Sequence, residues 1–197
     1  MRDLYIAVVD DDAPIRDSLE IYLSSEGRRI ACFPDGEAFL AAVVSDPPDI
    51  VFLDVKMPGL SGLEVLRRLD RPSFPVIMVS AHGDISIAVQ AIKLGAADFI
   101  EKPFTSQAVD EAVAAAGEKN PASAGAPAQS DPLAALTERE REIALALNEG
   151  LTNKEIARKY EISPRTVEVH RARVFEKTGV RNVAGLVRLL AGFDLAQ

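Results

Sequence analysis

The chain has 197 residues, of which 48% are hydrophobic and 26% charged, a balance typical of a folded, soluble protein of one or two domains. No apolar run approaches the roughly 20 residues of a membrane span, the start of the chain lacks a secretory signal pattern, and a single cysteine cannot form an internal disulfide. These features exclude a membrane-embedded protein and a disulfide-rich secreted one, and they indicate the cytoplasm.

The net charge of −8 is unevenly distributed. Residues 1–120 hold 11 Lys and Arg against 20 Asp and Glu, whereas residues 121–197 hold 11 against 10. Within 151–188, nine basic residues stand against four acidic ones. An acidic part joined to a locally basic one predicts two functions, the second of them on nucleic acid.

Strand-like and helix-like runs alternate up to about residue 119. The apolar, strand-length runs are 4–9, 29–33, 50–53, 75–79 and 97–100. The runs with helical periodicity are 15–25, 37–44, 63–69, 85–94 (with Asp84 as its cap) and 106–116. Strict alternation predicts an α/β fold, a doubly wound five-stranded parallel sheet with right-handed crossovers and helices on both faces. Cys32, on the second strand, is predicted to be a small residue of the core.

Residues 117–132 are rich in Ala, Gly, Ser and Pro and contain no bulky apolar residue. This composition predicts an interdomain linker. An extension of the preceding helix is the alternative, and Pro121 and Pro127 argue against it. We therefore expect one domain over 1–119, a linker over 120–132 and a second domain over 133–197.

After the linker the periodicity is helical only. Four short helices are predicted over 137–148, 153–160, 164–178 and 183–190. Their start signals are the capping box of Thr137 with Glu140 and the caps Thr152, Ser163 and Asn182. A small all-α domain follows, in which the second and third helices have the proportions of a helix-turn-helix.

Polar side chains follow several strands of the predicted sheet. Asp10, Asp11 and Asp12 follow the first strand, Asp54 the third, Ser80 the fourth and Lys102 the fifth. Because the carboxyl ends of parallel strands meet at one edge, where open α/β sheets bind ligands, we expect three or more carboxylates, a hydroxyl and an ammonium to gather there. The simpler alternative, that Asp54 only caps the next helix, is weakened by this convergence.

Such a cluster of acids favours a particular chemistry. Neighbouring carboxylates resist ionising together, and Mg²⁺ relieves the repulsion while leaving room for phosphate oxygens. An aspartate can itself attack phosphorus to give an aspartyl phosphate, and Lys102 would neutralise a phosphoryl oxygen. Neither GxGxxG nor GxxxxGK[ST] occurs, so we expect another protein, and not bound ATP, to deliver the phosphoryl group.

The motifs occur in an order that resembles a known family. Residues 3–119, with VVDDD, LDVKMPGLSG, Ser80 and DFIEKPF, resemble the receiver domain of two-component response regulators. Residues 133–197, with LTERERE, GLTNKEIA and SPRTVEVHRARVFEKTG, resemble the LuxR-type helix-turn-helix of the FixJ/NarL class. The resemblance implies a flavodoxin-like receiver joined to a four-helix DNA-binding domain.

The resemblance also implies roles for the acidic cluster. Asp54 would be the phosphoacceptor. Mg²⁺ would be held by Asp10, Asp11 (the more direct ligand of the two), Asp54 and the backbone carbonyl of Lys56. Lys102, before a cis bond to Pro103, would contact the phosphate. Ser80 and Phe99 would be the switch pair, with Phe99 turning inward on phosphorylation. Phe99 by itself would be assigned to the core, and His82 is given no role.

In a helix-turn-helix the second helix enters the major groove. On 164–178, Val167, Val174 and Thr178 share an inward face with His170 beside them. The predicted DNA contacts are Lys154, Arg165, Thr166, Glu168, Val169, Arg171 and Arg173. Glu138, Glu140 and Glu142 are expected to keep the first helix of this domain off DNA.

The sequence therefore predicts a DNA-binding transcriptional response regulator, phosphorylated on Asp54 by a sensor histidine kinase, without independent catalytic turnover beyond autodephosphorylation. Its partners would be the kinase, promoter DNA as a duplex and, on phosphorylation, a second copy of the chain, with no membrane. One alternative is a magnesium-dependent phosphatase, which would need a second acid where Lys56 stands. Another is a phosphate-independent DNA-binding protein whose receiver only docks partners, against which the intact acidic cluster argues.

Overall fold

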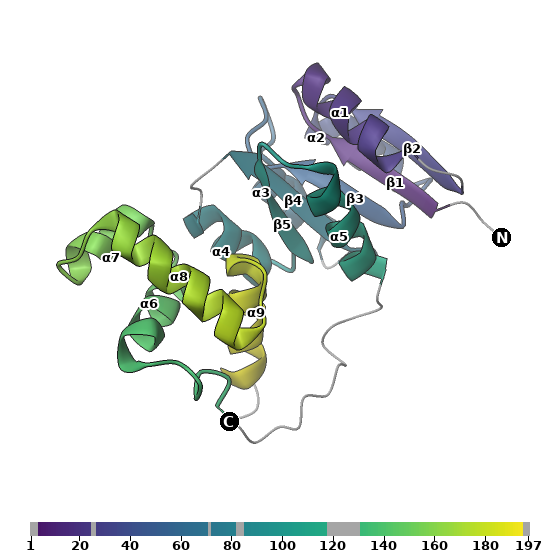
Figure 1. Ribbon diagram of the computed structural model, residues 1–197. Coiled ribbons are helices and arrows are strands. Elements are labelled where there is room, and N and C mark those ends of the chain that lie inside the picture. Colours follow the sequence, from purple (N-terminus) through teal and green to yellow (C-terminus); the bar gives the residue numbers. More distant parts are fainter. Residues whose placement is uncertain (1–3, 25–26, 71, 82–84, 118–130, 195–197) are drawn as a thin grey trace. The chain divides into compact units, whose positions relative to one another are not determined.

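The computed structural model of the protein describes residues 4–24, 27–70, 72–81, 85–117 and 131–194 (Figure 1). Contacts divide the chain into two compact units, one of residues 1–82 and 93–119 and one of residues 83–92 and 120–197. His82, the Asp84 cap and all of the predicted linker except Asp131 and Pro132 lie outside the described residues. In the described part, no helix is both long and apolar enough to span a bilayer.

The first unit is built on a five-stranded parallel sheet. Its strands are β1 (Leu4–Val9), β2 (Arg28–Phe33), β3 (Ile50–Asp54), β4 (Val76–Ala81) and β5 (Asp98–Lys102). Their order across the sheet is β2-β1-β3-β4-β5, and every neighbouring pair is parallel. This is the flavodoxin-like order, in which the sheet reverses direction between β1 and β3. The predicted fold class is confirmed.

Five helices connect the strands: α1 (Ala13–Leu23), α2 (Gly36–Val43), α3 (Gly62–Leu69), α4 (Ile85–Lys93) and α5 (Ser106–Gly117). α1 packs against α5, in front of the sheet in Figure 1, and α2 packs against α3. Between α1, α5 and the sheet lies a core of buried aliphatic residues with Phe52. All five residues of β3 are buried, as expected for a central strand covered on both faces.

The edge strand β2 differs from the central strands. It pairs only with β1 among the described strands, and each of its residues is half-buried or exposed, none fully buried. Cys32 is exposed, so its predicted place in the core is wrong. An edge strand is covered less completely than a central one, and the apolar run alone does not distinguish the two.

The ends of β4 and β5 matter for the site. Both strands run two residues past their predicted ends, because the ladder continues after the last apolar residue and pairs Ser80 with Glu101 and Ala81 with Lys102. Ser80 and Lys102 therefore belong to strands and not to loops, and the sheet itself fixes their positions.

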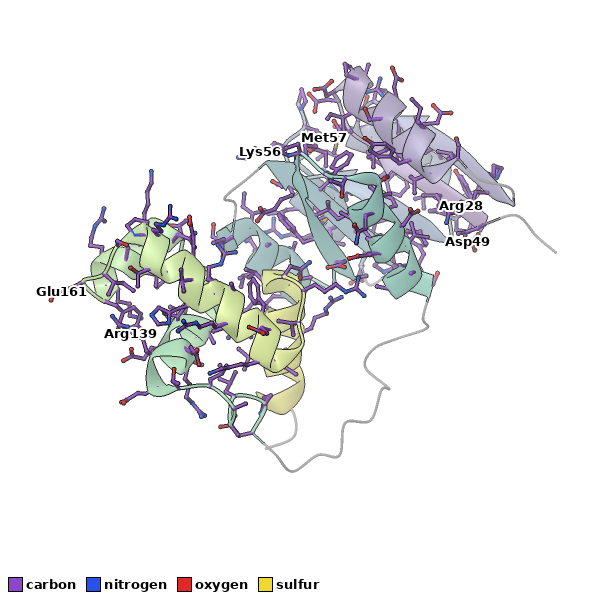
Figure 2. The ribbon with its side chains drawn as sticks, viewed as in Figure 1. Arg28, Asp49, Lys56, Met57, Arg139 and Glu161 are labelled. Atoms are coloured by element: carbon purple, nitrogen blue, oxygen red, sulfur yellow. The ribbon has the colours of Figure 1, made fainter. Side chains whose placement is uncertain are left out.

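Besides most of α4, the second unit contains α6 (Glu138–Asn148), α7 (Asn153–Lys159), α8 (Pro164–Thr178) and α9 (Val183–Asp194). α8 packs against α6 and α7, and α6 packs against α9. The predicted capping box at Thr137 is present, and the predicted caps Thr152 and Ser163 are present as well. The cap at Thr152 forms a capping box with Glu155, which was not predicted. α9 is four residues longer than predicted, since the helix continues through Asp194. Figure 2 shows the side chains of both units.

Candidate functional site

The carboxyl edge of the sheet brings together polar residues from four strands. Asp54 ends β3 and is only 4% exposed. Asp10 follows β1 directly and is buried. Ser80, also buried, lies one residue beyond Val79, the register partner of Asp54. Burial of three polar side chains at one edge is costly unless they have partners, which marks this edge as a functional site.

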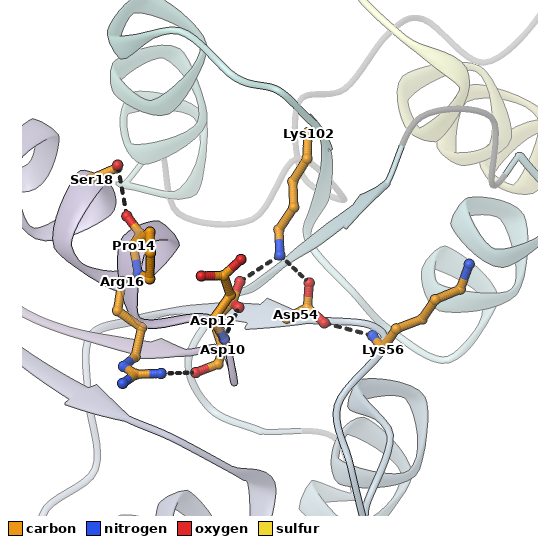
Figure 3. A network of polar contacts seen from close by, with 8 residues as sticks. All are labelled: Asp10, Asp12, Pro14, Arg16, Ser18, Asp54, Lys56 and Lys102. Carbon is orange, nitrogen blue, oxygen red and sulfur yellow. Dashed lines mark hydrogen bonds and ion pairs between the residues drawn. The ribbon is translucent and has the colours of Figure 1, made fainter.

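Lys102 joins the two buried carboxylates (Figure 3). Its Nζ lies 2.6 Å from Oδ2 of Asp10 and 2.5 Å from Oδ1 of Asp54. The other oxygen of Asp54, Oδ2, accepts a hydrogen bond of 2.6 Å from the backbone N–H of Lys56. Carboxylate oxygens from two neighbouring strands thus converge on one cationic atom.

Burial and hydrogen bonding act in opposite directions on these charges. Burial raises the pKa of Asp54, and the hydrogen bond and charge of Lys102 offset this only in part. For Lys102, burial lowers the pKa, but its hydrogen bonds to Asp10 and Asp54 outweigh burial and the pKa is raised. Lys102 therefore stays a cation, and Asp54 is a poorly solvated carboxylate next to it.

Asp11 does not join this pair. It is exposed, and in the described part of the chain no three acidic, His or Cys side chains are spaced to hold a metal ion. The role predicted for Asp11 in the cluster stays a prediction, and the contacts of Lys102 bring together Asp10 and Asp54. Their two oxygens still fit Mg²⁺, which takes hard oxygen ligands and needs only one or two carboxylates.

In the second unit, α8 presents an exposed polar face. Val167 and Val174 are buried, as predicted for the inward face. The exposed residues on the opposite side are Arg165, Glu168, Val169, Ala172 and Arg173. Lys154 on α7 is exposed as well.

Two other residues predicted to contact DNA, Thr166 and Arg171, form hydrogen bonds within the protein. Nη1 of Arg171 lies 2.8 Å from Oδ1 of Asn153 at the start of α7, so Arg171 links α8 to α7. The hydroxyl of Thr166 lies 2.8 Å from that of Ser163 at the start of α8. Both residues therefore help to fix the geometry of the helix pair.

Comparison with known proteins identifies both domains. Residues 6–114 match the response regulator receiver domain, and residues 134–190 match the luxR family of bacterial regulatory proteins. The transcriptional regulatory protein FixJ of Bradyrhizobium diazoefficiens is 42% identical over 191 residues, covering 94% of this chain and 93% of the relative. The chain belongs to the FixJ class of two-component response regulators. It is thus a transcriptional regulator with a receiver and a DNA-binding domain.

Two solved structures and a further regulatory protein are also similar to this chain. Full-length FixJ from B. japonicum aligns over 99% of both chains with a TM-score of 0.54 and 40% identity. The receiver domain of NtrX from Brucella abortus covers 58% of this chain and 99% of its own, with a TM-score of 0.56 and 41% identity. The C4-dicarboxylate transport transcriptional regulatory protein DctR of Rhodobacter capsulatus is 40% identical over 93% of this chain and 98% of its own.

Phe99 of this response regulator departs from the expected starting position. The ring belongs to β5 and is 7% exposed, so it already lies inward. An inward turn on phosphorylation is therefore not available from this conformation. The apolar character of Phe99, which by itself favours the core, gave the correct placement.

Glu140 also departs from its prediction. Its side chain is buried and its Oε2 lies 2.6 Å from Nζ of Lys177 on α8. The pair neutralises the charge, so Glu140 does not keep DNA away by repulsion as predicted. Glu138 is exposed, and Glu142 binds Arg139 at 2.8 Å.

Sequence reasoning missed the role of Gly62 in the regulator's site. A Cβ on Gly62 would lie 2.1 Å from the backbone oxygen of Asp54, so only glycine allows α3 to start this close to the phosphoacceptor candidate. α3 is also capped by Ser61 and Glu64, whose side chains form a capping box. The Ser-x-x-Glu spacing is a signal that could have found this cap.

Proposed function

We propose that Asp54 accepts a phosphoryl group from a sensor histidine kinase, and that the phosphorylated protein dimerises and binds promoter DNA. The observation that carries this proposal is the convergence of Asp54 and Asp10 on Lys102 at the ligand-binding edge of the sheet. A buried carboxylate with an adjacent fixed cation is suited to receive a group that is itself anionic.

The transfer has a simple balance of bonds. A carboxylate oxygen of Asp54 attacks phosphorus, a new O–P bond forms, and the P–N bond to the kinase histidine breaks with its electron pair passing to the ring nitrogen. Partial desolvation, which raises the pKa of Asp54, makes that carboxylate more basic than an exposed one. Lys102 lies within reach to neutralise a phosphoryl oxygen.

Mg²⁺ is part of the proposal. Asp10 and Asp54 would hold it, together with Asp11 and the backbone carbonyl of Lys56. When bound, the ion would neutralise charge on the carboxylate and phosphoryl oxygens. Lys102 occupies the point where the two carboxylates meet, so it would release Asp10 when the ion binds.

Phosphorylation would change the balance of charge at this edge. A phosphoryl group adds about −1.5 to −2 charge and three acceptor oxygens. Lys102 would exchange its carboxylate partners for the phosphoryl group, and the hydroxyl of Ser80 would donate to it. Phe99, packed on the neighbouring strand, would respond by repacking and not by entering from solvent.

The remaining parts of the proposal concern the rest of the chain. Lys154 and Arg171 would bind DNA phosphates, and the other DNA contacts would be Arg165, Thr166, Glu168, Val169 and Arg173. The receiver ends at 119 and the DNA-binding domain begins at 133, so brief proteolysis should cut between them and release two folded pieces. The protein acts in the cytoplasm and turns over no substrate beyond losing its own phosphoryl group.

Phosphate incorporation tests the proposal directly. With acetyl phosphate and Mg²⁺, the wild-type chain should gain one phosphoryl group, located on Asp54 by mass spectrometry. Asp54→Asn should gain none and remain folded, whereas Asp110→Asn, which changes an exposed acid on α5, should behave as wild type. Incorporation by Asp54→Asn at wild-type level would refute the acceptor, and continuous phosphate release would instead identify a phosphatase.

A further inference from the structure

The loop between β1 and α1 is held in place by a side chain of α1 itself. Nη1 of Arg16 donates a 2.6 Å hydrogen bond to the backbone carbonyl of Asp10 (Figure 3). Asp12, which precedes α1, makes no capping hydrogen bond through its side chain within the part that the structure describes. Arg16 therefore holds the β1–α1 loop in place, where the N-cap residue Asp12 makes no side-chain hydrogen bond to do so.

Every polar group of Asp10 has a partner. Its N–H donates to the carbonyl of Phe33 on β2 at 3.2 Å, and its carbonyl accepts from Arg16. Oδ1 accepts from the N–H of Asp12 at 2.9 Å, and Oδ2 accepts from Lys102. The contacts with Phe33, Arg16 and Asp12 hold Asp10 in position. Only Oδ2, which binds the mobile end of a lysine side chain, can exchange its partner for a metal ion.

We propose that Arg16 is a positioning residue that holds the β1–α1 loop so that Oδ2 of Asp10 points at the metal and phosphoryl site. This inference rests on the proposed function, since it assumes that Asp10 helps to hold Mg²⁺ beside Asp54. Arg16 acts through the main chain of Asp10 and does not itself touch the reacting atoms.

Charge and positioning predict opposite effects for the loss of Arg16. By charge alone, removing a cation close to a Mg²⁺ site should strengthen binding of the ion, because like charges repel. Loss of positioning should weaken it, because groups that orient metal ligands are typically worth about 10- to 100-fold in metal affinity. The sign of the change therefore distinguishes the two.

The experiment uses the full chain with Mg²⁺ alone as the probe. Isothermal titration calorimetry should show Mg²⁺ binding weakened about tenfold in Arg16→Met. Arg16→Lys, which keeps a donor, should lie between Arg16→Met and wild type. Arg67→Met, which removes an exposed arginine from α3, should match wild type.

Two further measurements separate positioning from loss of fold. Amide exchange at Asp12, whose N–H binds Oδ1 of Asp10, should accelerate in Arg16→Met, while exchange at Ile6 in the core stays at the wild-type rate. Phosphate incorporation from acetyl phosphate should need more Mg²⁺ but reach the wild-type rate at saturation.

The outcomes are distinct for the two proposals. Unchanged or tighter Mg²⁺ binding in Arg16→Met would overturn the positioning role and leave the phosphoacceptor intact. Accelerated exchange at both Asp12 and Ile6 would also overturn it, since the variant would then have lost the domain and not only the loop. If the wild-type chain itself neither bound Mg²⁺ nor took up phosphate, the proposed function would fail, and this inference with it.

Discussion

Lys177 on α8 reaches the first turn of α6, where its Nζ lies 2.6 Å from Oε2 of Glu140. The same oxygen of Glu140 accepts the N–H of Thr137 at 2.9 Å, so one buried carboxylate both caps α6 and ties it to α8. The position of the helix that carries the predicted DNA contacts therefore depends in part on the charge of Glu140.

The stability of the DNA-binding domain should fall in acid through Glu140. The hydrogen bond from Lys177, followed by that from Thr137, lowers the pKa of Glu140 from the ordinary value of 4.5 to about 2. A carboxyl group with a lowered folded-state pKa stabilises the fold above its unfolded pKa, and that contribution is lost as the pH falls from 4.5 towards about 2. Lys177→Met should lower the urea midpoint at neutral pH, and the difference from wild type should shrink across this window.

Lys159→Met is the matched control, because Lys159 pairs with Glu149 on the exposed surface, where ion pairs contribute little. A midpoint difference between Lys177→Met and wild type that stayed constant down to about pH 2 would show that packing, and not the charge of Glu140, is responsible.

Gly62→Ala should destabilise the receiver domain and slow its phosphorylation. The added Cβ would need the backbone oxygen of Asp54, 2.1 Å away, to move, and overpacking of this kind typically costs about 1–3 kcal/mol. Thermal unfolding should show that loss, and phosphate incorporation should slow because Asp54 shifts. A Cβ at Gly117 would meet no described atom within 4 Å, so Gly117→Ala should not destabilise the protein. Equal stability of the two variants would contradict the close packing of Gly62 against the backbone oxygen of Asp54.

Glu161→Gly should stabilise the protein or leave it unchanged. Glu161, in the turn between α7 and α8 (labelled in Figure 2), has a φ of +54°, which costs a non-glycine residue roughly 1–2 kcal/mol. Glycine removes that strain but costs about 0.5–1 kcal/mol in backbone entropy, so we expect a net gain of up to about 1.5 kcal/mol in the free energy of unfolding. Glu176→Gly, inside α8, should lose about 1 kcal/mol, so the same substitution has opposite signs at the two sites. A loss at both would count against strain at Glu161.

Two substitutions on the DNA-binding face should have different effects. Glu168 is exposed on α8 and suited to accept from cytosine N4, so Glu168→Ala should relax preference at one operator position by roughly 1–3 kcal/mol. Lys154 is suited to bind a DNA phosphate, so Lys154→Ala should weaken binding to all sequences alike. It should also reduce the slope of log affinity against log salt concentration by about one. Titrations on operator variants at several salt concentrations measure both. Uniform loss in Glu168→Ala, or altered base preference in Lys154→Ala, would mean that the groove-facing side is misassigned.

The sequence predicted the fold well because its signals were local and repeated. Alternating strand and helix patterns determined the parallel sheet, and caps such as Thr137 and Ser163 located the helix starts. The placement of Asp54 and Lys102 at one edge followed from the rule that the carboxyl ends of parallel strands lie at the same edge of a sheet.

What the sequence did not reveal depends on tertiary packing. Whether Asp11 joins Asp10, and whether Phe99 lies inward, is decided by contacts among strands far apart in the chain. The pairing of Glu140 with Lys177 and the bond from Arg16 to a carbonyl have no spacing signature. Gly62 looked like any turn residue, since the oxygen that forbids a side chain there belongs to the end of β3.

The bridge formed by Lys102 also bears on protein synthesis. Lys102 lies 92 positions after Asp10 and 48 after Asp54, so it leaves the ribosome last of the three. Domains generally fold as units during synthesis, and until β5 emerges the two carboxylates have no lysine between them. A nascent receiver that stops before β5 therefore lacks the cation that joins Asp10 to Asp54, so this bridge is among the last parts of the candidate site to form.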